Sequence, residues 1–293
     1  MSGLSGVPQV GFGTFIGIEA DRIADETERF RVVEESVFNA LKEGFRHLDC
    51  AKNYGNLKAV GRALEKAYGE LDIRREDIWI TCKGSPEDTL DEILADLRTD
   101  HLDLYLAHHP VFYDSESHLV DSWRSMNELV RTKKTRFIGV SNHYRQHLKP
   151  LLRICKEAHL SKPFANEIET HPLDQEPELV AYCQKNDIHV IAQSPLAYNL
   201  SSVLLDSPAL RDVASELDVS SAQVALAWNL KRGVSVIPKA RSAEHVRENF
   251  RSAELISKLT EDHMERLGGL DWGDPVTETA EQFKRARVDL KSE

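Results

Sequence analysis

Asp49 and Tyr54 are the side chains of this sequence that most directly suggest chemistry, because a carboxylate and a phenol stand five residues apart after an apolar stretch. The segment FRHLDCAKNYG, residues 45–55, predicts a short buried strand over 45–48 and a loop over 50–54. An acid just past the carboxyl end of a strand is a poor core residue, but ligands of α/β folds bind outside those ends. Taken alone, the pair is also compatible with a helix-capping acid and a packing tyrosine.

A lysine near Asp49 and Tyr54 would make these residues suitable for proton transfer, and Lys83 is the candidate. It follows the apolar stretch 78–82, which is predicted to be a strand. A free tyrosine titrates near ~10, and a neighbouring ammonium favours the phenolate, so we expect Lys83 to lower the pKa of Tyr54 toward working pH. Asp49 would keep Lys83 charged and oriented. The competing interpretation is a simple ion pair that joins two strands.

His108 is the fourth candidate, at the start of the sequence HHP after an apolar strand. Two adjacent histidines are compatible with a metal site as well as with acid–base chemistry. A metal-dependent barrel hydrolase normally has an H-x-H on its first strand, whereas this chain has GFGTF at residues 11–15. We therefore expect no metal. His109, His143 and His171 are compatible with ordinary structural roles.

Apolar strands and amphipathic helices alternate along the chain with a period of about 30 residues. Strands are predicted over 10–14, 45–48, 78–82, 102–107, 136–140, 164–168, 188–192 and 234–237, and helices over 31–43, 57–68, 85–97, 117–130, 146–158, 177–185, 221–231 and 243–250. Eight such units without a linker predict one α/β domain, a single (β/α)8 TIM barrel over residues 1–293. A doubly wound sheet is the alternative.

Polar residues follow, or end, seven of these predicted strands. In a barrel the carboxyl ends converge on one cavity, so residues far apart in sequence become neighbours. The residues concerned are Asp49, Lys83, His108, Ser141, Asn142, Glu167, Gln193, Ser194 and Lys239.

Composition limits the classes of function. The chain has 48 acidic residues against 37 Lys and Arg, a net charge of −11, which argues against a nucleic-acid or anionic-membrane binder. Its four cysteines show neither CxxC nor zinc spacing, and no apolar run is long enough to span a membrane. The first ten residues do not resemble a secretion signal. These features favour a cytoplasmic protein in a reducing setting.

The sequence resembles the aldo-keto reductase superfamily over nearly its whole length. The resemblance rests on GFGT, LDCAKNYGN, TCK, DLYLAHHP, IGVSN, NEIETHP, SPL and VIPK followed by RENF. It implies a (β/α)8 barrel that reduces aldehydes or ketones with NADPH, with NADH as the alternative cofactor. By position in these motifs, Asp49, Tyr54, Lys83 and His108 correspond to the family's catalytic tetrad. Tyr54 would donate the proton, and His108 would orient the carbonyl.

The resemblance also implies the residues that meet the cofactor. Ser141, Asn142 and Glu167 would hold the nicotinamide carboxamide, Lys239 and Arg241 the 2′-phosphate, and Glu248 and Asn249 the adenine. Gly11-x-Gly13 lacks the third glycine and the helix of a dinucleotide fingerprint, so a Rossmann site is not supported. The full implied cofactor set is Gly13, Thr14, Phe15, Asp49, Ser141, Asn142, Glu167, Gln193, Ser194, Pro195, Leu196, Lys239, Ala240, Arg241, His245, Glu248 and Asn249.

Five positions depart from the family pattern. Glu167 replaces a Gln, so an ionised side chain there accepts but cannot donate a hydrogen bond. Gln193 replaces an aromatic residue that stacks on the nicotinamide. His245 and Ala240 replace an Arg and a Ser near the 2′-phosphate, which makes NADPH preference a hypothesis based on Lys239 and Arg241. His109 replaces a Trp beside the substrate, which Tyr54, His108 and His109 would contact.

The pocket is therefore expected to be open, with Phe15, Phe112 and Tyr113 as candidate walls. Two alternatives to a reductase remain: a NADPH-binding regulatory or redox-sensing barrel, and a metal-dependent hydrolase. The expected partner is a small carbonyl substrate, without nucleic acid or membrane, and a monomer is compatible with the sequence. The segment 271–293 is interpreted as either a pocket cover or a surface helix.

Overall fold

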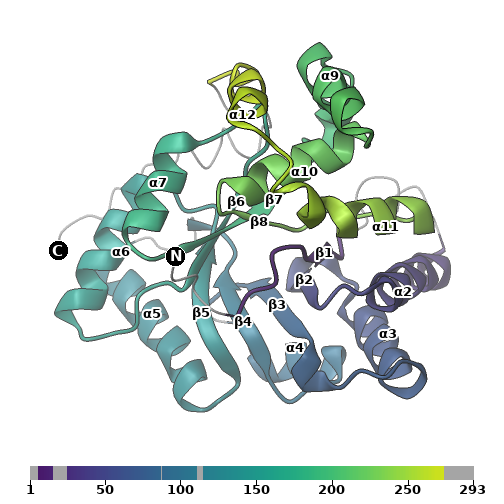
Figure 1. The fold of residues 1–293 in the computed structure, drawn as a ribbon. Coiled ribbons are helices and arrows are strands. Elements are labelled where there is room, and N and C mark those ends of the chain that lie inside the picture. The colour runs from purple at the N-terminus through teal and green to yellow at the C-terminus, as the bar shows by residue number, and fades with distance from the viewer. Residues whose placement is uncertain (1–5, 16–24, 87, 111–114, 274–293) are drawn as a thin grey trace.

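A parallel sheet of eight strands forms the centre of the molecule (Figure 1). The computed structural model describes residues 6–15, 25–86, 88–110 and 115–273. Each strand pairs with the next one in the sequence, as βα repeats require. The strands are β1 (Phe12–Gly13), β2 (His47–Ala51), β3 (Trp79–Gly84), β4 (Leu102–Ala107), β5 (Thr135–Ser141), β6 (Ala165–Glu169), β7 (His189–Gln193) and β8 (Ser235–Val236).

The sheet is curled, and the segment that precedes β1 meets β8 at the other edge. Val10 pairs with Val236 in parallel, Gly11 N donates to Val236 O at 2.8 Å, and Val236 N donates to Gln9 O at 2.9 Å. A Cβ at Gly13 would stand 2.8 Å from the carbonyl oxygen of Ile237. The glycine at this position therefore permits the close approach of the two segments.

Helices surround the outer side of the sheet (Figure 1), and apolar side chains of both layers form the largest core. Strand residues that face outward, such as Leu48 and Ile80, are fully buried against them. The helices are α2 (Glu26–Glu43), α3 (Leu57–Glu70), α4 (Leu90–Leu97), α5 (Glu116–Arg131), α6 (Arg145–Glu157), α7 (Pro177–Lys185), α8 (Ser201–Leu205), α9 (Pro208–Leu217), α10 (Ser221–Lys231), α11 (Ala243–Arg251) and α12 (Glu261–Gly268), with short 3₁₀ turns η1 (Lys52–Tyr54), η2 (Arg75–Asp77), η4 (Tyr198–Leu200) and η5 (Ser252–Leu255).

Aromatic rings fill the sheet interior at the amino ends of the strands. Trp79 stacks on Phe137 and Phe164 with ring centroids 5.8 and 6.1 Å away, and the two phenylalanine rings are 4.2 Å apart. We call these three rings the aromatic floor. They pack with Leu104, Leu106, Ala165, Ile191 and Ile237 in a separate apolar cluster. The floor leaves the carboxyl ends of the strands as the polar end of the interior.

Two boundary predictions are wrong in ways that affect the site. Asp49 and Lys83 lie within β2 and β3, not beyond them, because both strands continue with buried backbone pairs through Ala51 and Gly84. Ser141 and Gln193, also predicted to follow their strands, are the last residues of β5 and β7. The helix predicted from Ser85 begins instead at Leu90, because Ser85 N donates to the Asp88 carboxylate at 2.7 Å and Asp88 N donates to Ser85 O at 3.0 Å in a turn ahead of the helix.

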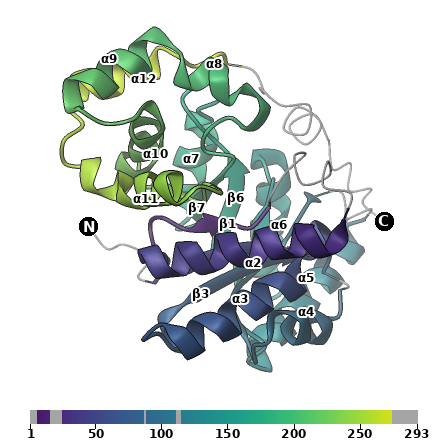
Figure 2. The same ribbon diagram turned by 90° about the vertical axis from the view of Figure 1, so that its right-hand side faces the viewer.

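Three helices were not predicted: α8, α9 and α12. They gather with α10 at one end of the molecule, away from α3 and α4 (Figure 2). Leu210, Val213 and Trp228 are buried in a second apolar cluster there. These three helices are short, with five, ten and eight residues, and they lie outside the alternation of strands and helices on which the prediction was based. Among the described residues, no helix is long and apolar enough to cross a membrane.

Candidate active site

Asp49, Lys83 and Glu167 form a charged cluster inside the sheet, which we call the Lys83 cluster. Lys83 Nζ lies 2.5 Å from Asp49 Oδ2 and 2.9 Å from Glu167 Oε1. Their side chains are 0 to 2% exposed, and they come from β2, β3 and β6. One ammonium is thus shared by two buried carboxylates. The sequence-based expectation that Lys83 meets Asp49 is confirmed, but the contact with Glu167 was not anticipated.

Burial and the opposing charges determine the protonation states of the cluster. Burial alone lowers the pKa of Lys83, but the charges of Asp49 and Glu167 outweigh it and hold that pKa well above its ordinary value. Burial, and then the charge of Asp49, raises the pKa of Glu167 to about 8, against the opposing effect of Lys83. Of the two carboxyl groups, Glu167 is therefore the one whose protonated form burial favours, while Lys83 stays charged.

Tyr54 lies in η1 beside the cluster and is half-buried. Lys83 Nζ is 5.3 Å from the centre of its ring. Burial raises the pKa of the phenol above its ordinary value; Lys83 opposes this effect, while the Asp49 and Glu167 carboxylates add to it. The expectation that Lys83 would lower this pKa toward working pH is wrong, because it considered one ammonium and neither the burial nor the second carboxylate.

His108 and His109 stand next to this phenol. The His108 ring is 6.3 Å from the Tyr54 ring at an interplanar angle of 79°, and it stacks on His109 at 4.1 Å. Burial, and then the charge of Lys83, lowers the pKa of His108 to about 2 and that of His109 to about 4. Both imidazoles are therefore neutral at physiological pH and serve as hydrogen-bonding groups without charge.

A hydrogen-bonded rim adjoins the two histidines. Asn142 Nδ2 donates to the carbonyl oxygen of His108 at 3.1 Å, and Gln193 Nε2 donates to Asn142 Oδ1 at 2.7 Å. Ser141 Oγ and Asn142 N donate to the carbonyl oxygen of Glu167 at 3.0 and 2.8 Å. The link from Gln193 was missed from sequence, where this residue was noted only for the lost aromatic ring; it orients Asn142.

The Glu167 carboxyl group fits the carboxamide of a nicotinamide. Among the described residues, neither of its oxygens has a hydrogen-bond partner of good geometry, although Oε1 stands 2.9 Å from Lys83 Nζ. A buried polar group in this state needs a partner that the chain does not supply. The amide N–H groups of a carboxamide beside Ser141 and Asn142 would supply it.

Thr14 and Phe15 border the other side of the phenol. Thr14 Oγ1 and N donate to the carbonyl oxygen of Asp49 at 2.9 and 3.0 Å, and Asn56 Nδ2 donates to Thr14 O at 2.9 Å. The Phe15 ring lies 4.9 Å from the Tyr54 ring and is 41% exposed. Phe15 thus presents an exposed apolar ring beside Tyr54, and its role as a pocket wall stays a prediction. Phe112 and Tyr113, the other candidate walls, and residues 274–293 lie outside the described residues.

The residues expected along the rest of the cofactor lie after β7 and β8. Ser194, Pro195 and Leu196 form a turn in which Ala197 N donates to Ser194 O at 2.8 Å. Lys239, Arg241 and His245 are exposed around the start of α11, whereas Asn249 is buried and its Nδ2 donates to Lys239 O at 3.5 Å. Ala240 and Glu248 are half-buried in the same segment. A helix amino terminus with a Lys and an Arg suits a phosphate group.

Lys52 is a further residue that sequence reasoning missed. Its ammonium pairs with Asp88 at 2.8 Å and lies 3.7 Å from Glu92. This pair joins η1, which carries Tyr54, to the turn after β3, which follows Lys83. The sequence shows Lys52 two residues before Tyr54, but its partner Asp88 lies 36 residues away and could not be identified from the sequence.

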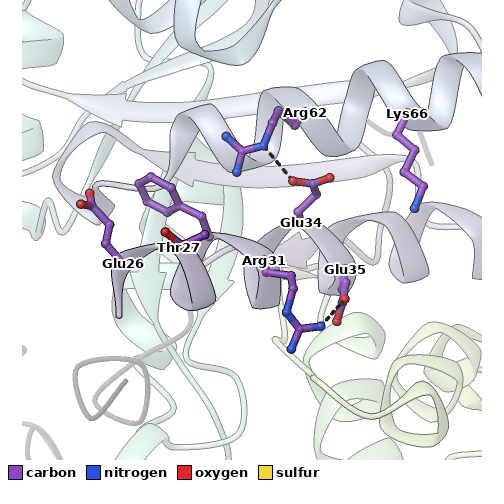
Figure 3. Close-up of a pocket in the computed structure, with 8 residues that line it drawn as sticks. Glu26, Thr27, Arg31, Glu34, Glu35, Arg62 and Lys66 are labelled. Atoms are coloured by element: carbon purple, nitrogen blue, oxygen red, sulfur yellow. Dashed lines mark hydrogen bonds and ion pairs between the residues drawn. The ribbon is translucent and has the colours of Figure 1, made fainter. Parts of the chain in front are cut away.

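A surface hollow of about 610 Å³ lies between α2 and α3 and is lined by none of the residues of the Lys83 cluster (Figure 3). Its charges neutralise one another, with Arg62 on Glu34 at 2.8 Å and Arg31 on Glu35 at 2.5 Å. Nothing in this hollow suggests chemistry. Within the described part of the chain, no three His, Cys, Asp or Glu side chains are placed to hold a metal ion.

The fold and site together define an α/β protein with a buried proton-transfer cluster at the carboxyl ends of its parallel strands. The Aldo/keto reductase family matches residues 9–271, so the chain belongs to that family. D/L-glyceraldehyde reductase of Hypocrea jecorina is 37% identical over 284 residues, covering 85% of this chain and 81% of that protein. Aldose reductase of Encephalitozoon cuniculi is 34% identical over 273 residues, covering 85% and 86%.

A solved relative agrees with this assignment. The aldo-keto reductase of Bombyx mori, determined in complex with NADP, superposes with a TM-score of 0.82 at 25% identity, covering 96% of this chain and 95% of that one. The likeness extends over nearly the full parallel sheet and its helices.

Proposed function

We propose that this protein is an NADPH-dependent reductase of aldehydes and ketones. Membership of the aldo/keto reductase family and relatives named glyceraldehyde and aldose reductase support carbonyl reduction. A family structure in complex with NADP supports the cofactor. The observation that carries the proposal is the convergence of a phenol, a neutral imidazole and a buried ammonium–carboxylate pair at one end of the sheet.

Tyr54 is the proton donor of the proposed reaction. NADPH, when bound, supplies the hydride to the carbonyl carbon. Because its pKa is raised, Tyr54 is protonated at working pH and can give its proton to the carbonyl oxygen. Lys83 then stabilises the phenolate that remains, and Asp49 keeps the Lys83 ammonium in place. These side chains act as general acid and positioning groups, and no step requires a metal.

His108 orients the substrate in this scheme. As a neutral imidazole it donates one hydrogen bond to the carbonyl oxygen without competing for the Tyr54 proton. His109 and the exposed Phe15 ring border the space in front of it. The substrate class is a small carbonyl compound, with few aromatic groups from the described residues to select among such compounds.

The cofactor is proposed to run along the rim. Ser141, Asn142 and Glu167 would hold the nicotinamide carboxamide, and residues 194–196 would lie along the pyrophosphate. Lys239 and Arg241 at the start of α11 would hold the 2′-phosphate, which gives preference for NADPH over NADH. This placement rests on the family motif and on the chemistry of the side chains at each position.

We further propose that residues 1–293 form one domain and that the curled sheet is a closed (β/α)8 barrel. The hydrogen bonds between residues 9–11 and Val236 support closure.

The test is turnover. Purified protein is mixed with NADPH and a panel of small aliphatic and aromatic aldehydes, and NADPH oxidation is followed by absorbance over many equivalents of enzyme. Multiple turnovers with at least one aldehyde are expected. Tight NADPH binding without turnover on any member of the panel would instead favour a regulatory or redox-sensing barrel.

A further inference from the structure

The Glu167 carboxyl group is part of the buried Lys83 cluster as well as a proposed contact of the carboxamide. It shares the Lys83 ammonium with Asp49 at 2.9 and 2.5 Å, and all three side chains are buried. With both carboxylates ionised, the cluster would carry a net negative charge away from water, which is unfavourable. With Glu167 protonated, the cluster is neutral. The free protein therefore keeps one extra proton at this point.

A positive charge near Glu167 would favour its ionised form over its protonated form. Glu167 is paired in register with Ser141, and its backbone oxygen accepts from Ser141 Oγ and Asn142 N, the residues proposed to hold the nicotinamide. The oxidised nicotinamide carries a positive charge that the reduced ring lacks. An ionised carboxylate beside such a charge in a buried site stabilises it strongly.

We propose that Glu167 is a proton-holding residue that releases its proton to solvent when the oxidised cofactor binds and keeps it when NADPH binds. The inference rests on the proposed function. In this step the Glu167 O–H bond breaks, the proton passes to water, and no electron is transferred. Asp49 holds Lys83 throughout, so the two carboxylates have separate roles: Asp49 positions the ammonium, and Glu167 adjusts the charge of the site to the oxidation state of the cofactor.

Five of the titratable groups around Glu167 have pKa values displaced far enough to keep their charge constant between pH 6 and 9. Lys83 and Tyr54 have raised pKa values, whereas His47, His108 and His143 have pKa values lowered to about 4, about 2 and about 3. The groups that face it from the packed elements are Asp49 and His47 on β2, Tyr54 in η1, Lys83 on β3, His108 after β4, His143 after β5, and Glu169 and His171 at and beyond the end of β6. Cys50 and Cys82 on the helix-facing side have raised thiol pKa values.

The proposal is tested by binding, without catalysis. Dissociation constants of NADP⁺ and NADPH are measured by quenching of protein fluorescence from pH 6 to 9.5, and their ratio is used because it cancels ionisation of the shared 2′-phosphate. The ratio for the wild-type protein should shift toward NADP⁺ by at least about tenfold between pH 6 and 9 and then level off. Glu167→Gln should give a ratio that does not change with pH.

Glu169→Gln is the matched control, because Glu169 is a buried carboxylate on the same strand whose Oε1 lies 3.3 Å from His171 Nε2. It should keep the wild-type pH dependence. Proton release on adding NADP⁺ in weak buffer at pH 7, and loss of a protonated carboxyl band in difference infrared spectra, should occur in the wild type and in this control but not in Glu167→Gln.

Three outcomes decide the matter. A pH-independent ratio in a wild type that binds both cofactors and reduces aldehydes overturns the role of Glu167 and leaves the proposed function intact. Wild-type pH dependence that persists in Glu167→Gln assigns the proton to another group and also overturns it. Failure of the wild type to bind either cofactor overturns the proposed function itself. Because the wild-type curve and proton release are informative alone, the test survives a poorly folding variant.

Discussion

The two ends of the sheet interior contain opposite kinds of side chain, apolar rings at one end and ionisable groups at the other. At the amino ends, the aromatic floor of Trp79, Phe137 and Phe164 closes the interior with stacked rings. At the carboxyl ends, the Lys83 cluster places three ionisable groups at 0 to 2% exposure. Rings bury apolar area and gain stability, whereas charges taken out of water gain little even when paired. The difference teaches that stability comes from one end and reactivity from the other.

This division explains why the pKa values at the carboxyl end are displaced. Burial stabilises an apolar side chain, but it raises the pKa of Tyr54 and Glu167 and lowers that of His108. Functional sites commonly carry such shifts and sacrifice stability for them. Substitutions at either end test whether the aromatic floor provides stability and the Lys83 cluster provides reactivity.

The largest effect is expected from Tyr54→Phe. Removing the hydroxyl deletes the proton donor without changing the ring, so kcat for aldehyde reduction should fall by about 10² to 10⁴-fold. NADPH affinity, measured by fluorescence titration, should stay within a few-fold of the wild type. Near-normal turnover in this variant would remove Tyr54 from the reaction.

Lys83→Met should damage both reactivity and stability. It leaves Asp49 and Glu167 in the interior without their shared ammonium, which should lower the free energy of unfolding by about 3–5 kcal/mol in urea titrations. Adding Glu167→Gln to this variant removes one of the two carboxylates and should restore part of the loss. Equal stability of Lys83→Met and wild type would show that the pair is not buried as described.

Trp79→Ala tests the other end. Loss of the largest ring of the aromatic floor should lower the free energy of unfolding by about 3–5 kcal/mol. Because Trp79 is at the start of β3 and Lys83 near its end, kcat per folded molecule should change less than threefold. A large fall in kcat with unchanged stability would contradict the division between the two ends.

Arg241→Met should have a smaller and more selective effect. Loss of one charged contact to the 2′-phosphate is expected to weaken NADPH about tenfold while leaving NADH, which lacks that phosphate, unchanged. The measurement is kcat/KM with each cofactor. Equal kcat/KM for NADH and NADPH in the wild type would already refute NADPH preference.

The smallest effect is expected from pH: the profile of kcat/KM should show no inflection caused by titration of His108 or His109. Since the pKa of His108 is about 2 and that of His109 about 4, both are neutral from pH 5.5 to 8. In this range the pH profiles of kcat/KM for reduction should therefore have the same shape in the wild type and in His108→Gln. Such an inflection near pH 6.5 would mean that His108 is exposed to water.

Much of the fold followed from periodicity. The ranges of α7 and α10 agree with prediction because each has a clear start, at Pro177 or after the capping Ser220, and a clear end. The start of α4 did not, because the Asp88 turn depends on a side-chain hydrogen bond that no pattern reports. α9 was missed although its apolar residues recur at helical spacing, because it is an extra helix between two βα units and packs in the second apolar cluster.

The same contrast holds for the site. Residue types and motif order determined by themselves which side chains stand at the strand ends, since an alternating chain of strands and helices brings those ends together. Only the tertiary structure decided the charge of each group, because that depends on distances between residues such as Lys83 and Glu167, 84 positions apart, and on how much water they lose. Position along a strand is a local property, whereas electrostatic energy depends on every neighbour that folding supplies.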